Sequence, residues 1–449
     1  MGNDHFCRIQ TEPLVNAPSK YTQSMNPYKC NQPDHDLSRR QVLGALTGAA
    51  AGMGVNGLLS PAIADQLKSK RKQVLLIWLD GGISQLESWD PKPGTEFGGP
   101  FRAIPTSIPG VHISELMPKT AEQMHNLAVV RSMCTKDENH SSGVPRILRG
   151  DPKNRGVTYP YLGAAMSYLR GEEQIDLPNY IWVKPGSGGF IWQHAGFLGA
   201  KYGALALGDG KPPVHINRPA EITDAKDSSR NAIRRQLNER FRVGRRSADV
   251  DAYDYSFEMA EKLITRKDLF DDFTPAEKDR YGTHPLGRHI LQSKRLIEEG
   301  VMFVQCHSYH WDTHGDNFNM HLDLVPQIDK PFAALIEDWE QSGMLDNVLV
   351  LLMSEFGRTP KINQRLGRDH WPEAWSLAMA GCGLNRGVVL GKTTDNGAWV
   401  DDREIDIGHI FHTVFKAMDI NSHTTEYHID GQPLPIAHDD YGVIEELLS

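Results

Sequence analysis

Cysteine is scarce in this sequence, with five residues among 449. The three that follow residue 64 are Cys134, Cys306 and Cys382, and their odd number and wide spacing exclude a disulfide framework while allowing one bridge. A dominant charge is also missing, because the formal net charge is only -9 and acidic and basic residues are interspersed. Without the basic stripe that binds phosphate backbones, we expect no nucleic-acid partner.

Long hydrophobic runs are missing as well. The most extended apolar segment, residues 42–59, is interrupted by several glycines and by Asn56, whereas a membrane span needs about 20 strongly apolar residues. Arg39 and Arg40 precede this segment, and an Ala-x-Ala sequence ends it at Ala64. This is the arrangement of a secretory signal, and paired arginines before a weakly apolar core favour the twin-arginine exporter.

The segment predicts how the chain is processed. We expect cleavage after Ala64, so that residues 1–64 form a twin-arginine signal region and residues 65–449 form the mature protein. The twin-arginine export machinery is then a partner, and the mature protein lies in the periplasm or outside the cell with no stable membrane span. A membrane anchor or a surface helix at the same residues is the alternative.

The whole sequence has an ordinary globular composition, since 39% of it is hydrophobic and 23% is charged. Short, continuous apolar runs predict buried strands of a parallel sheet. These runs are residues 74–79, 126–130, 301–305 and 347–353. Helical patterns at 287–299 and at 331–343, where Pro331 lies near the start, alternate with them. We therefore predict a single α/β domain with a mostly parallel central sheet and helices on both faces, and a peripheral helical segment around 228–267 without chemistry of its own.

Polar groups follow the apolar runs, and ligands of such sheets bind outside the carboxyl ends of the strands. Asp80-Gly81-Gly82 comes directly after the first run, where a carboxylate can face a ligand while glycine lets backbone approach closely. An aspartate that only caps the turn would have the same sequence. Glu355 follows the last run, and a buried carboxylate there needs a metal or Arg358 as its partner.

The segment His310–Asp316 is the densest in candidate metal ligands, with four such groups within seven residues. Asp312 and His314 flank a single residue, a compact spacing for shared or adjacent metal ligands. An exposed polar loop is the alternative interpretation. We favour metal binding because solvation of a loop does not require so many ligating groups.

Two further segments contain histidine beside polar residues. Gly367–Trp371 places Asp369 next to His370, so Asp369 is an obvious candidate to orient that imidazole. Asn139–Gly143 follows the second apolar run and contains His140, so it could supply a nucleophile or a further ligand. Taken alone, capping and surface hydrogen bonding explain both segments equally well.

Together the motifs resemble the alkaline phosphatase and sulfatase superfamily, and within it a secreted branch, domain-of-unknown-function family 1501. The resemblance extends over nearly all of the mature chain and includes the paired-arginine leader. Its motifs are D-G-G-x-S-Q at 80–85, W-D-P-K-P at 89–93, N-H from 139, Y-P-x-L-G at 159–163, W-D-T-H-G-D-N-F at 311–318, E-F-G-R-T-P at 355–360 and G-R-D-H-W at 367–371. The last three motifs are specific.

The resemblance implies an alkaline-phosphatase-like core in which carboxylates and histidines at strand ends hold one or two divalent metal ions. Carried over position by position, it implies these metal ligands: Asp80, Asp312, His314, Glu355 and His370. Phe356 stands where the superfamily motif has histidine, and the superfamily more often spaces the Asp/His pair further apart. The mixed nitrogen and oxygen donors favour zinc, manganese or iron over calcium.

The nucleophile is left open by the resemblance. Phosphatases of the superfamily use Ser or Thr after the second strand, where Thr135, Ser141 and Ser142 are the available hydroxyls. His140 could be a metal ligand, a general base or a substrate contact. The C-x-P-x-R motif of formylglycine sulfatases is absent, because T-K-D-E follows Cys134. Sulfatase activity by that mechanism is therefore disfavoured.

We predict metal-dependent hydrolysis of an anionic ester, a small molecule or a glycan, with phosphate slightly favoured over sulfate. Metal ions can neutralise the transition state, activate the nucleophile and stabilise the leaving oxygen with few residues. Arg358 or Arg368 would hold the nonbridging oxygens, which a planar guanidinium suits. The alternative is a non-catalytic protein on the same fold that binds a metal or an anionic glycan.

Overall fold

The computed structural model describes residues 71–448 with short gaps. The gaps are residues 151–152, 154, 171–176, 213–220, 244–247 and 430. The predicted export signal, including Arg39, Arg40 and the cleavage site after Ala64, lies outside the described residues and stays a prediction. Among the described residues, no helix is both long enough and apolar enough to cross a bilayer.

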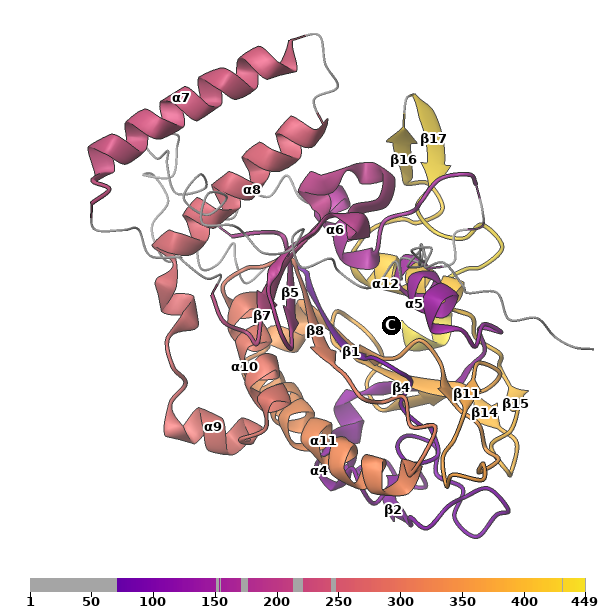
Figure 1. The fold of residues 1–449 in the computed structure, drawn as a ribbon. Coiled ribbons are helices and arrows are strands. Elements are labelled where there is room, and N and C mark those ends of the chain that lie inside the picture. The colour runs from indigo at the N-terminus through magenta and orange to yellow at the C-terminus, as the bar shows by residue number, and fades with distance from the viewer. Residues whose placement is uncertain are drawn as a thin grey trace, which may run out of the picture.

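A nine-stranded sheet forms the centre of the protein (Figure 1). Its strands, from one edge to the other, are β13 (Val388–Leu390), β4 (Ala128–Met133), β12 (Trp375–Ala380), β9 (Val348–Met353), β1 (Gln73–Leu79), β8 (Phe303–Ser308), β5 (Tyr180–Lys184), β7 (Ala204–Gly208) and β6 (Gly189–Ile191). The five strands from β9 to β7 run parallel, whereas β12 and β6 are antiparallel to their neighbours. The predicted α/β class with a mostly parallel sheet is confirmed.

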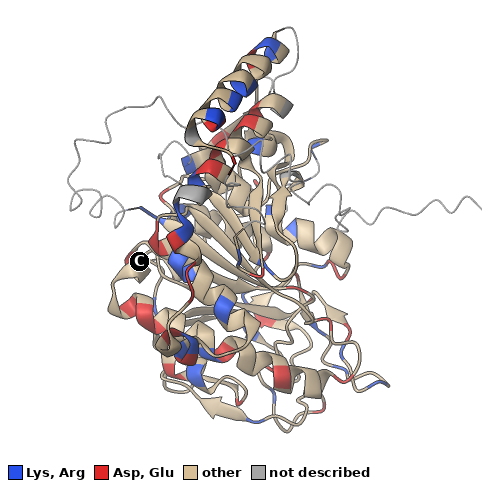
Figure 2. Cartoon of the chain, turned by 60° about the vertical axis from the view of Figure 1, so that its left-hand side comes forward, with Lys and Arg blue, Asp and Glu red and all other residues tan. Residues whose placement is uncertain are grey.

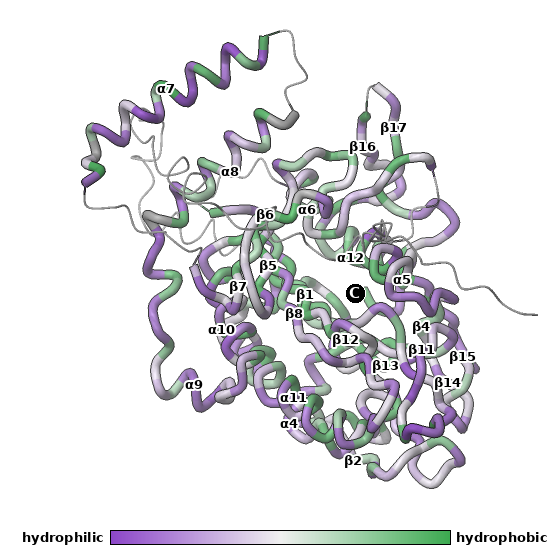
Figure 3. Tube along the Cα trace, viewed as in Figure 1, coloured by the Kyte–Doolittle hydropathy of each residue, from purple (hydrophilic) through white to green (hydrophobic). Residues whose placement is uncertain are grey.

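Both faces of the sheet are covered, and β1 shows why its sequence is continuously apolar. Leu75, Ile77 and Leu79 belong to one buried cluster. The alternate residues Val74 and Leu76 belong to a second cluster. Because successive side chains of a strand point to opposite faces, a strand between two helical layers needs apolar residues at every position. Figure 3 shows the resulting hydrophobic centre.

Helices form a layer on each face. The first layer contains α4 (Pro118–Gln123), α10 (Pro285–Glu298) and α11 (Asn317–Gln341). The second contains α5 (His140–Arg149), α6 (Leu162–Arg170) and α12 (Ile407–Ala417). Outside the layers lie α9 (Pro275–Tyr281) and four two-stranded sheets. These sheets pair β2 (Ala103–Pro105) with β3 (His112–Ser114), β10 (Gly357–Arg358) with β11 (His370–Trp371), β14 (Lys392–Thr393) with β15 (Val400–Asp402), and β16 (Glu426–Ile429) with β17 (Gln432–Pro435).

The predicted helix at 331–343 was wrong in its start. The observed helix, α11, begins at Asn317 and contains Pro331 in its interior. Proline favours the first turn of a helix because it lacks an N–H, but burial can outweigh the lost hydrogen bond. His321, Val325 and Ile328 are all fully buried at helical spacing, so packing against the sheet extends the helix through the proline.

The charged segment around 228–267 is helical in the structure. It forms α7 (Asp224–Arg242) and α8 (Ala248–Thr265), which project from the body and carry both signs of charge (Figures 1 and 2). Elsewhere, Cys134, Cys306 and Cys382 are buried free thiols, so the one disulfide that the sequence allowed does not form.

Candidate metal centre

The turn after β1 holds the candidate centre together through its backbone. Gly81 has φ +117°, and a Cβ added there would lie 2.5 Å from the backbone nitrogen of Asp312. The Gly81 N–H donates to Oε1 of Glu355 at 2.9 Å. The carbonyl oxygens of Gly81 and Gly82 both accept from the Arg358 guanidinium. The Asp-Gly-Gly motif therefore joins the segments that contain Asp312, Glu355 and Arg358, although they are far apart in sequence.

Replacing Gly81 with alanine should lower the free energy of unfolding by about 3 kcal/mol or more, because strain at positive φ and a backbone collision both oppose the methyl group. Gly94→Ala is the matched control, since Gly94 also has positive φ, at +75°, but no atom within 4 Å of the added Cβ. We expect the control to lose only about 1–2 kcal/mol. Urea unfolding measures both, and equal losses would contradict the role given to the close approach.

The carboxylate of Asp312 lies among three imidazoles. Its Oδ1 is 3.0 Å from Nε2 of His314 and 3.0 Å from Nε2 of His370. The two Nε2 atoms are also 3.0 Å apart. His140 approaches from the start of α5, with its Nε2 3.5 Å from Oδ2 of Asp312. Ligand atoms of His140, Asp312 and His370 all lie within 4.8 Å of one another. These four side chains are called the histidine cluster below.

In each imidazole of the histidine cluster, Nδ1 lies within hydrogen-bonding distance of a carboxylate or carbonyl oxygen outside the cluster. His140 Nδ1 is 2.7 Å from Oε1 of Glu355. His314 Nδ1 is 2.6 Å from Oδ1 of Asp369, and His370 Nδ1 is 2.6 Å from the backbone carbonyl of Glu138. An acceptor at Nδ1 orients the ring so that Nε2 faces the cluster, as in metal sites where a carboxylate or carbonyl orients each histidine ligand.

Asp369 was expected to orient its neighbour His370, and that expectation was wrong. Adjacent residues of an extended segment point to opposite sides. His370 lies on the short strand β11, so Asp369 turns away from it and holds His314 instead. The backbone of residue 138 takes over the orienting role for His370.

The donor set fits a divalent cation. Ligand atoms about 2.0–2.2 Å from one zinc ion lie roughly 3.3 Å apart, close to the 3.0 Å sides of the triangle formed by Asp312, His314 and His370. Two nitrogens and one carboxylate oxygen suit zinc, manganese or iron. Close by, the second oxygen of the fully buried Glu355 has no hydrogen-bond partner within the described residues. An unpaired buried carboxylate oxygen is costly, and a nearby cation lowers that cost.

Asp80 and Glu355 lie next to the histidine cluster, at the ends of β1 and β9. Glu355 holds His140 from behind, and Asp80 lies beside the cluster, where burial and then the negative charge of Glu355 raise its pKa to about 6. Their role as direct ligands stays a prediction. The geometry favours Glu355 as the orienting partner of His140.

Charges also act on the pKa values within the cluster. Burial lowers the pKa of His140, but its contacts with Asp312 and Glu355 outweigh burial and raise the value to about 9. Burial opposes ionisation of Asp312, yet hydrogen bonds from His140, His370 and Arg358 hold its pKa well below the usual range. In the metal-free cluster, the carboxylate of Asp312 is therefore ionised and accepts hydrogen bonds from the donors around it. A bound cation would stabilise the same negative charge.

In the metal-free protein, Asp80→Asn should become stabilising as pH rises. The pKa of Asp80 is higher in the folded protein, about 6, than its ordinary value of 3.8. Its contribution to stability is therefore fully present below pH about 4 and is lost as pH rises through about 6. Asparagine cannot ionise, so we expect the variant to exceed the wild type by at most about 3 kcal/mol at pH 8. Urea unfolding in chelator at pH 4 and pH 8 tests this, and a pH-independent difference would contradict it.

Arg358 and Arg368 each form several buried contacts with the loops around the cluster. Arg358 is fully buried, and its guanidinium donates to the carbonyls of Gly82 and Arg368 and, at 2.6 Å, to Asp312. Arg368 is fully buried and pairs with the buried carboxylate of Glu87 at 2.8 Å. One or the other was expected to hold the nonbridging oxygens of the substrate. That role stays a prediction, and these contacts favour positioning the loops around the cluster.

The hydroxyls expected near the cluster have other surroundings. Thr135 is fully buried, and its Oγ1 accepts from the indole of Trp375 at 3.3 Å. Ser142 Oγ donates to Asp137 at 2.9 Å. Ser141 is exposed on the first turn of α5, directly after His140. Burial raises the pKa of the Cys134 thiol to about 12, so no thiolate is available there. Of the predicted hydroxyls, Ser141 is the one that directly follows a residue of the histidine cluster, His140.

Glu87 and Asn363 connect the loops around the cluster, and neither was predicted from the sequence. Besides pairing with Arg368, Glu87 accepts from Asn317 at the start of α11. Asn363 donates to the backbone carbonyl of His314 at 3.0 Å and to Asp369 at 3.1 Å. Glu87 lies between Leu86 and Ser88, and nothing in this local sequence indicates that it is buried or which residue pairs with it.

Fold and site together define an α/β protein with a histidine and carboxylate centre at the carboxyl ends of parallel strands. The sequence pattern of the family described as "Protein of unknown function (DUF1501)" matches residues 71–448. The chain therefore belongs to this family, and the family resemblance is confirmed. A comparison with curated proteins gives no match.

Several solved structures are similar at low identity. The PsFucS1 sulfatase from Pseudoalteromonas sp. is 12% identical, with 86% of this chain and 72% of that chain covered and a TM-score of 0.38. A protein in the alkaline phosphatase superfamily from Vibrio parahaemolyticus is 10% identical, with 85% and 75% covered and a TM-score of 0.34. The zinc complex of the C-terminal periplasmic domain of EcEptC from Escherichia coli is 10% identical, with 82% and 94% covered and a TM-score of 0.36. Scores this low transfer no function to this chain.

Proposed function

We propose that this protein is a metal-dependent hydrolase of anionic esters, with phosphate esters favoured over sulfate esters, that acts outside the cytoplasm. The observation that supports it most is the histidine cluster, in which every imidazole is held at Nδ1 and directs Nε2 toward Asp312. The location rests on the paired arginines and the weakly apolar segment that ends at Ala64.

Asp312, His314 and His370 would hold the cation. Three protein ligands that leave a position open are the pattern of catalytic rather than structural metal sites. When bound, the cation would neutralise the negative charge of the ester and polarise the bond to be cleaved. The absence of a C-x-P-x-R motif disfavours a formylglycine sulfatase and supports phosphate as the favoured ester.

His140 is placed to move a proton at Nε2. Glu355 fixes its Nδ1 at 2.7 Å, while its Nε2 lies 3.5 Å from Asp312, further out than the other two imidazoles. An oriented imidazole beside the reacting ester can give a proton to the leaving oxygen or take one from water. The fully buried ring of Phe356, centred 4.5 Å from His370 and 5.0 Å from His140, forms an apolar wall that limits water on this side.

A non-catalytic metal-binding protein is the second candidate. It is favoured by the positions of Thr135 and Ser142, because two of the three predicted hydroxyls have partners away from the cluster. An enzyme of this geometry must then use Ser141 or water as the attacking group. Ester turnover by the wild-type protein separates the two candidates. Loss of that turnover in Ser141→Ala with unchanged metal content would support Ser141 over water as the attacking group.

Metal analysis followed by an ester panel tests the proposal. We expect the purified protein to bind at least one divalent ion and to hydrolyse 4-nitrophenyl phosphate or bis(4-nitrophenyl) phosphate faster than 4-nitrophenyl sulfate. Chelation should stop turnover, and zinc or manganese should restore it. Stoichiometric metal without turnover of any ester would favour the binding protein, and absence of metal binding would contradict both candidates.

A further inference from the structure

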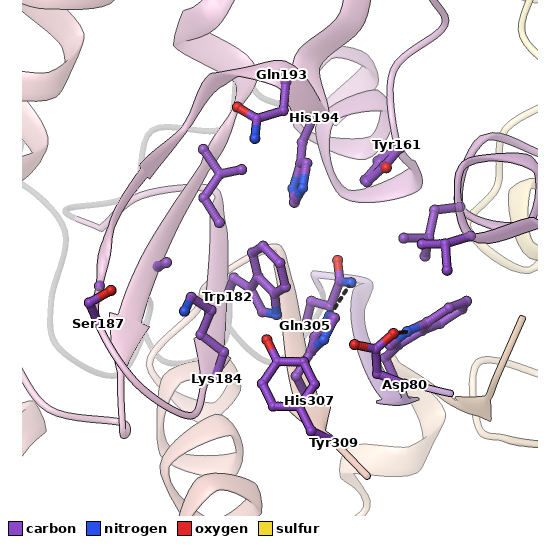
Figure 4. A pocket seen from close by; sticks show the side chains of 16 residues that line it. Asp80, Tyr161, Trp182, Lys184, Ser187, Gln193, His194, Gln305, His307 and Tyr309 are labelled. Carbon is purple, nitrogen blue, oxygen red and sulfur yellow. Dashed lines mark hydrogen bonds between the residues drawn. The ribbon is translucent and has the colours of Figure 1, made fainter. Parts of the chain in front are cut away.

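A cavity of about 260 Å³ lies between the sheet and α5, and Figure 4 shows the side chains that line it. Its lining includes residues of β1, β5 and β8 on one side and of α5 on the other. Val144 and Leu148 follow His140 at intervals of four on α5, so the helix that begins at the cluster continues along the cavity. Asp80 lines the cavity at the end of β1. The cavity therefore adjoins the proposed reaction centre.

One buried histidine in the cavity lacks a partner on one side. His307 is only 5% exposed, and its Nδ1 has no hydrogen bond within the described residues. The Tyr180 hydroxyl donates to Oε1 of Gln305, so the Gln305 amide nitrogen, 2.7 Å from His307 Nε2, acts as the donor there. Burial holds the pKa of His307 well below its ordinary value, so the ring is neutral and its proton is on Nδ1. The cavity thus contains an unpaired N–H donor.

Two more donors lie next to His307, on β5. The Trp182 ring centre is 4.3 Å from that of His307, and its buried Nε1 also lacks a partner within the described residues. Lys184, two residues further along the same face, donates to the carbonyl of Pro185 at 3.2 Å, its one hydrogen bond to the described residues. Burial lowers the pKa of Lys184, and the charge of Asp209 partly opposes this effect. In the described part of the chain, Lys184 forms no ion pair within 4 Å, so the side chains that line the cavity include three donors, one of which is the positively charged Lys184.

We propose that this cavity binds a pyranose ring that carries a carboxylate, as a part of the substrate remote from the ester. The proposal rests on the proposed hydrolase function, because it assigns the cavity to the substrate. The carboxylate would accept from Lys184, Trp182 Nε1 and His307 Nδ1, which removes the cost of leaving these donors unpaired.

The rest of the lining suits a sugar ring better than a fatty or aromatic acid. Aromatic faces of Trp182 and Tyr309 offer stacking surfaces, whereas Gln193 and Ser187 can hydrogen-bond to ring hydroxyls (Figure 4). A volume of about 260 Å³ lies just below the range of about 300–1,000 Å³ for drug-sized ligands, so it accommodates one ring rather than an extended chain.

Calorimetric titration of the metal-free full chain with glucuronate tests the proposal. Glucuronate has no ester to hydrolyse, so its binding is independent of turnover. We expect it to bind at least 10-fold more tightly than glucose, which lacks the carboxylate, and than benzoate, which lacks the hydroxyls. Lys184→Met should weaken glucuronate binding at least 10-fold, and Trp182→Phe, which keeps an aromatic face and removes the N–H, should weaken it about 5-fold. Lys392→Met, at an exposed surface lysine, is the matched control and should have no effect.

Each outcome bears on one claim. Equal affinity for glucuronate and glucose, tighter binding of benzoate, or unchanged affinity in both cavity variants would overturn the carboxylated-sugar proposal. If Lys184→Met does not fold, Trp182→Phe alone decides. Turnover of phosphate esters by a protein that does not bind glucuronate would overturn this inference and leave the hydrolase proposal intact. Glucuronate binding without turnover of any ester would overturn the hydrolase proposal and would leave a carboxylated-sugar site that is not part of a substrate site.

Discussion

Asp312→Ala is expected to lower the affinity for a divalent metal at least about 100-fold and to reduce ester turnover below detection. Asp312 is the only carboxylate among the three proposed ligands, and its Oδ1 lies 3.0 Å from both His314 Nε2 and His370 Nε2. Losing even an orienting partner of a ligand costs roughly 10–100-fold in affinity, so losing a charged ligand should cost more. Metal titration with a competing chelator and an ester assay measure both effects.

Asp316→Ala is the matched control for this prediction. Asp316 lies in the same loop and is exposed, and its carboxylate accepts from Asn319 at 2.8 Å rather than from the histidine cluster. We expect metal affinity and turnover within about twofold of the wild type. If both variants keep full metal affinity, the cluster is not the metal site. If both lose it equally, the loop acts through its fold and not through the Asp312 carboxylate.

Arg358→Met should have the largest effect on stability, a loss of about 3–5 kcal/mol in the free energy of unfolding. The side chain is fully buried and donates to the carbonyls of Gly81, Gly82 and Arg368 and to Asp312. Methionine fills similar space but leaves these acceptors without a donor, and buried unpaired acceptors are costly. Urea unfolding gives the loss as a shift in midpoint at an unchanged denaturant slope.

A surface arginine provides the comparison for Arg358. Arg386 is 43% exposed, and its nitrogens lie 3.9 Å from Glu340 and 3.6 Å from Asp346. Arg386→Met should lose less than about 1 kcal/mol, because solvent screens such pairs. A loss below about 1 kcal/mol in Arg358→Met as well would contradict the assignment of Arg358 as the residue that holds the loops together.

Much of the fold could be predicted because apolar runs report burial directly. The runs at 74–79 and 347–353 match β1 and β9 closely. The run at 301–305 begins two residues before β8, and the run at 126–130 begins two residues before β4, because propensity does not fix where pairing starts. The start of α11 was missed for a different reason. Pro331 has the local chemistry of a first turn, and only packing against the sheet shows that the helix runs through it.

The site was predictable in its location but only partly in its arrangement. The rule that parallel strands bring their carboxyl ends to one edge correctly grouped Asp312, His314 and His370. It could not show that Glu355 contacts Nδ1 of His140, because that contact depends on side-chain direction within a turn. The partner of His314 could not be predicted either, since Asp369 is 55 residues away in sequence.

Anomalous diffraction from crystals of the protein grown with zinc or manganese tests the central claim most directly. The account predicts a metal peak about 2.0–2.2 Å from Oδ1 of Asp312 and from Nε2 of both His314 and His370. The Nδ1 atoms of the two histidines should keep their contacts with Asp369 and with the carbonyl of Glu138. A peak bound by other residues, or no peak at saturating metal with the cluster unchanged, would contradict the account.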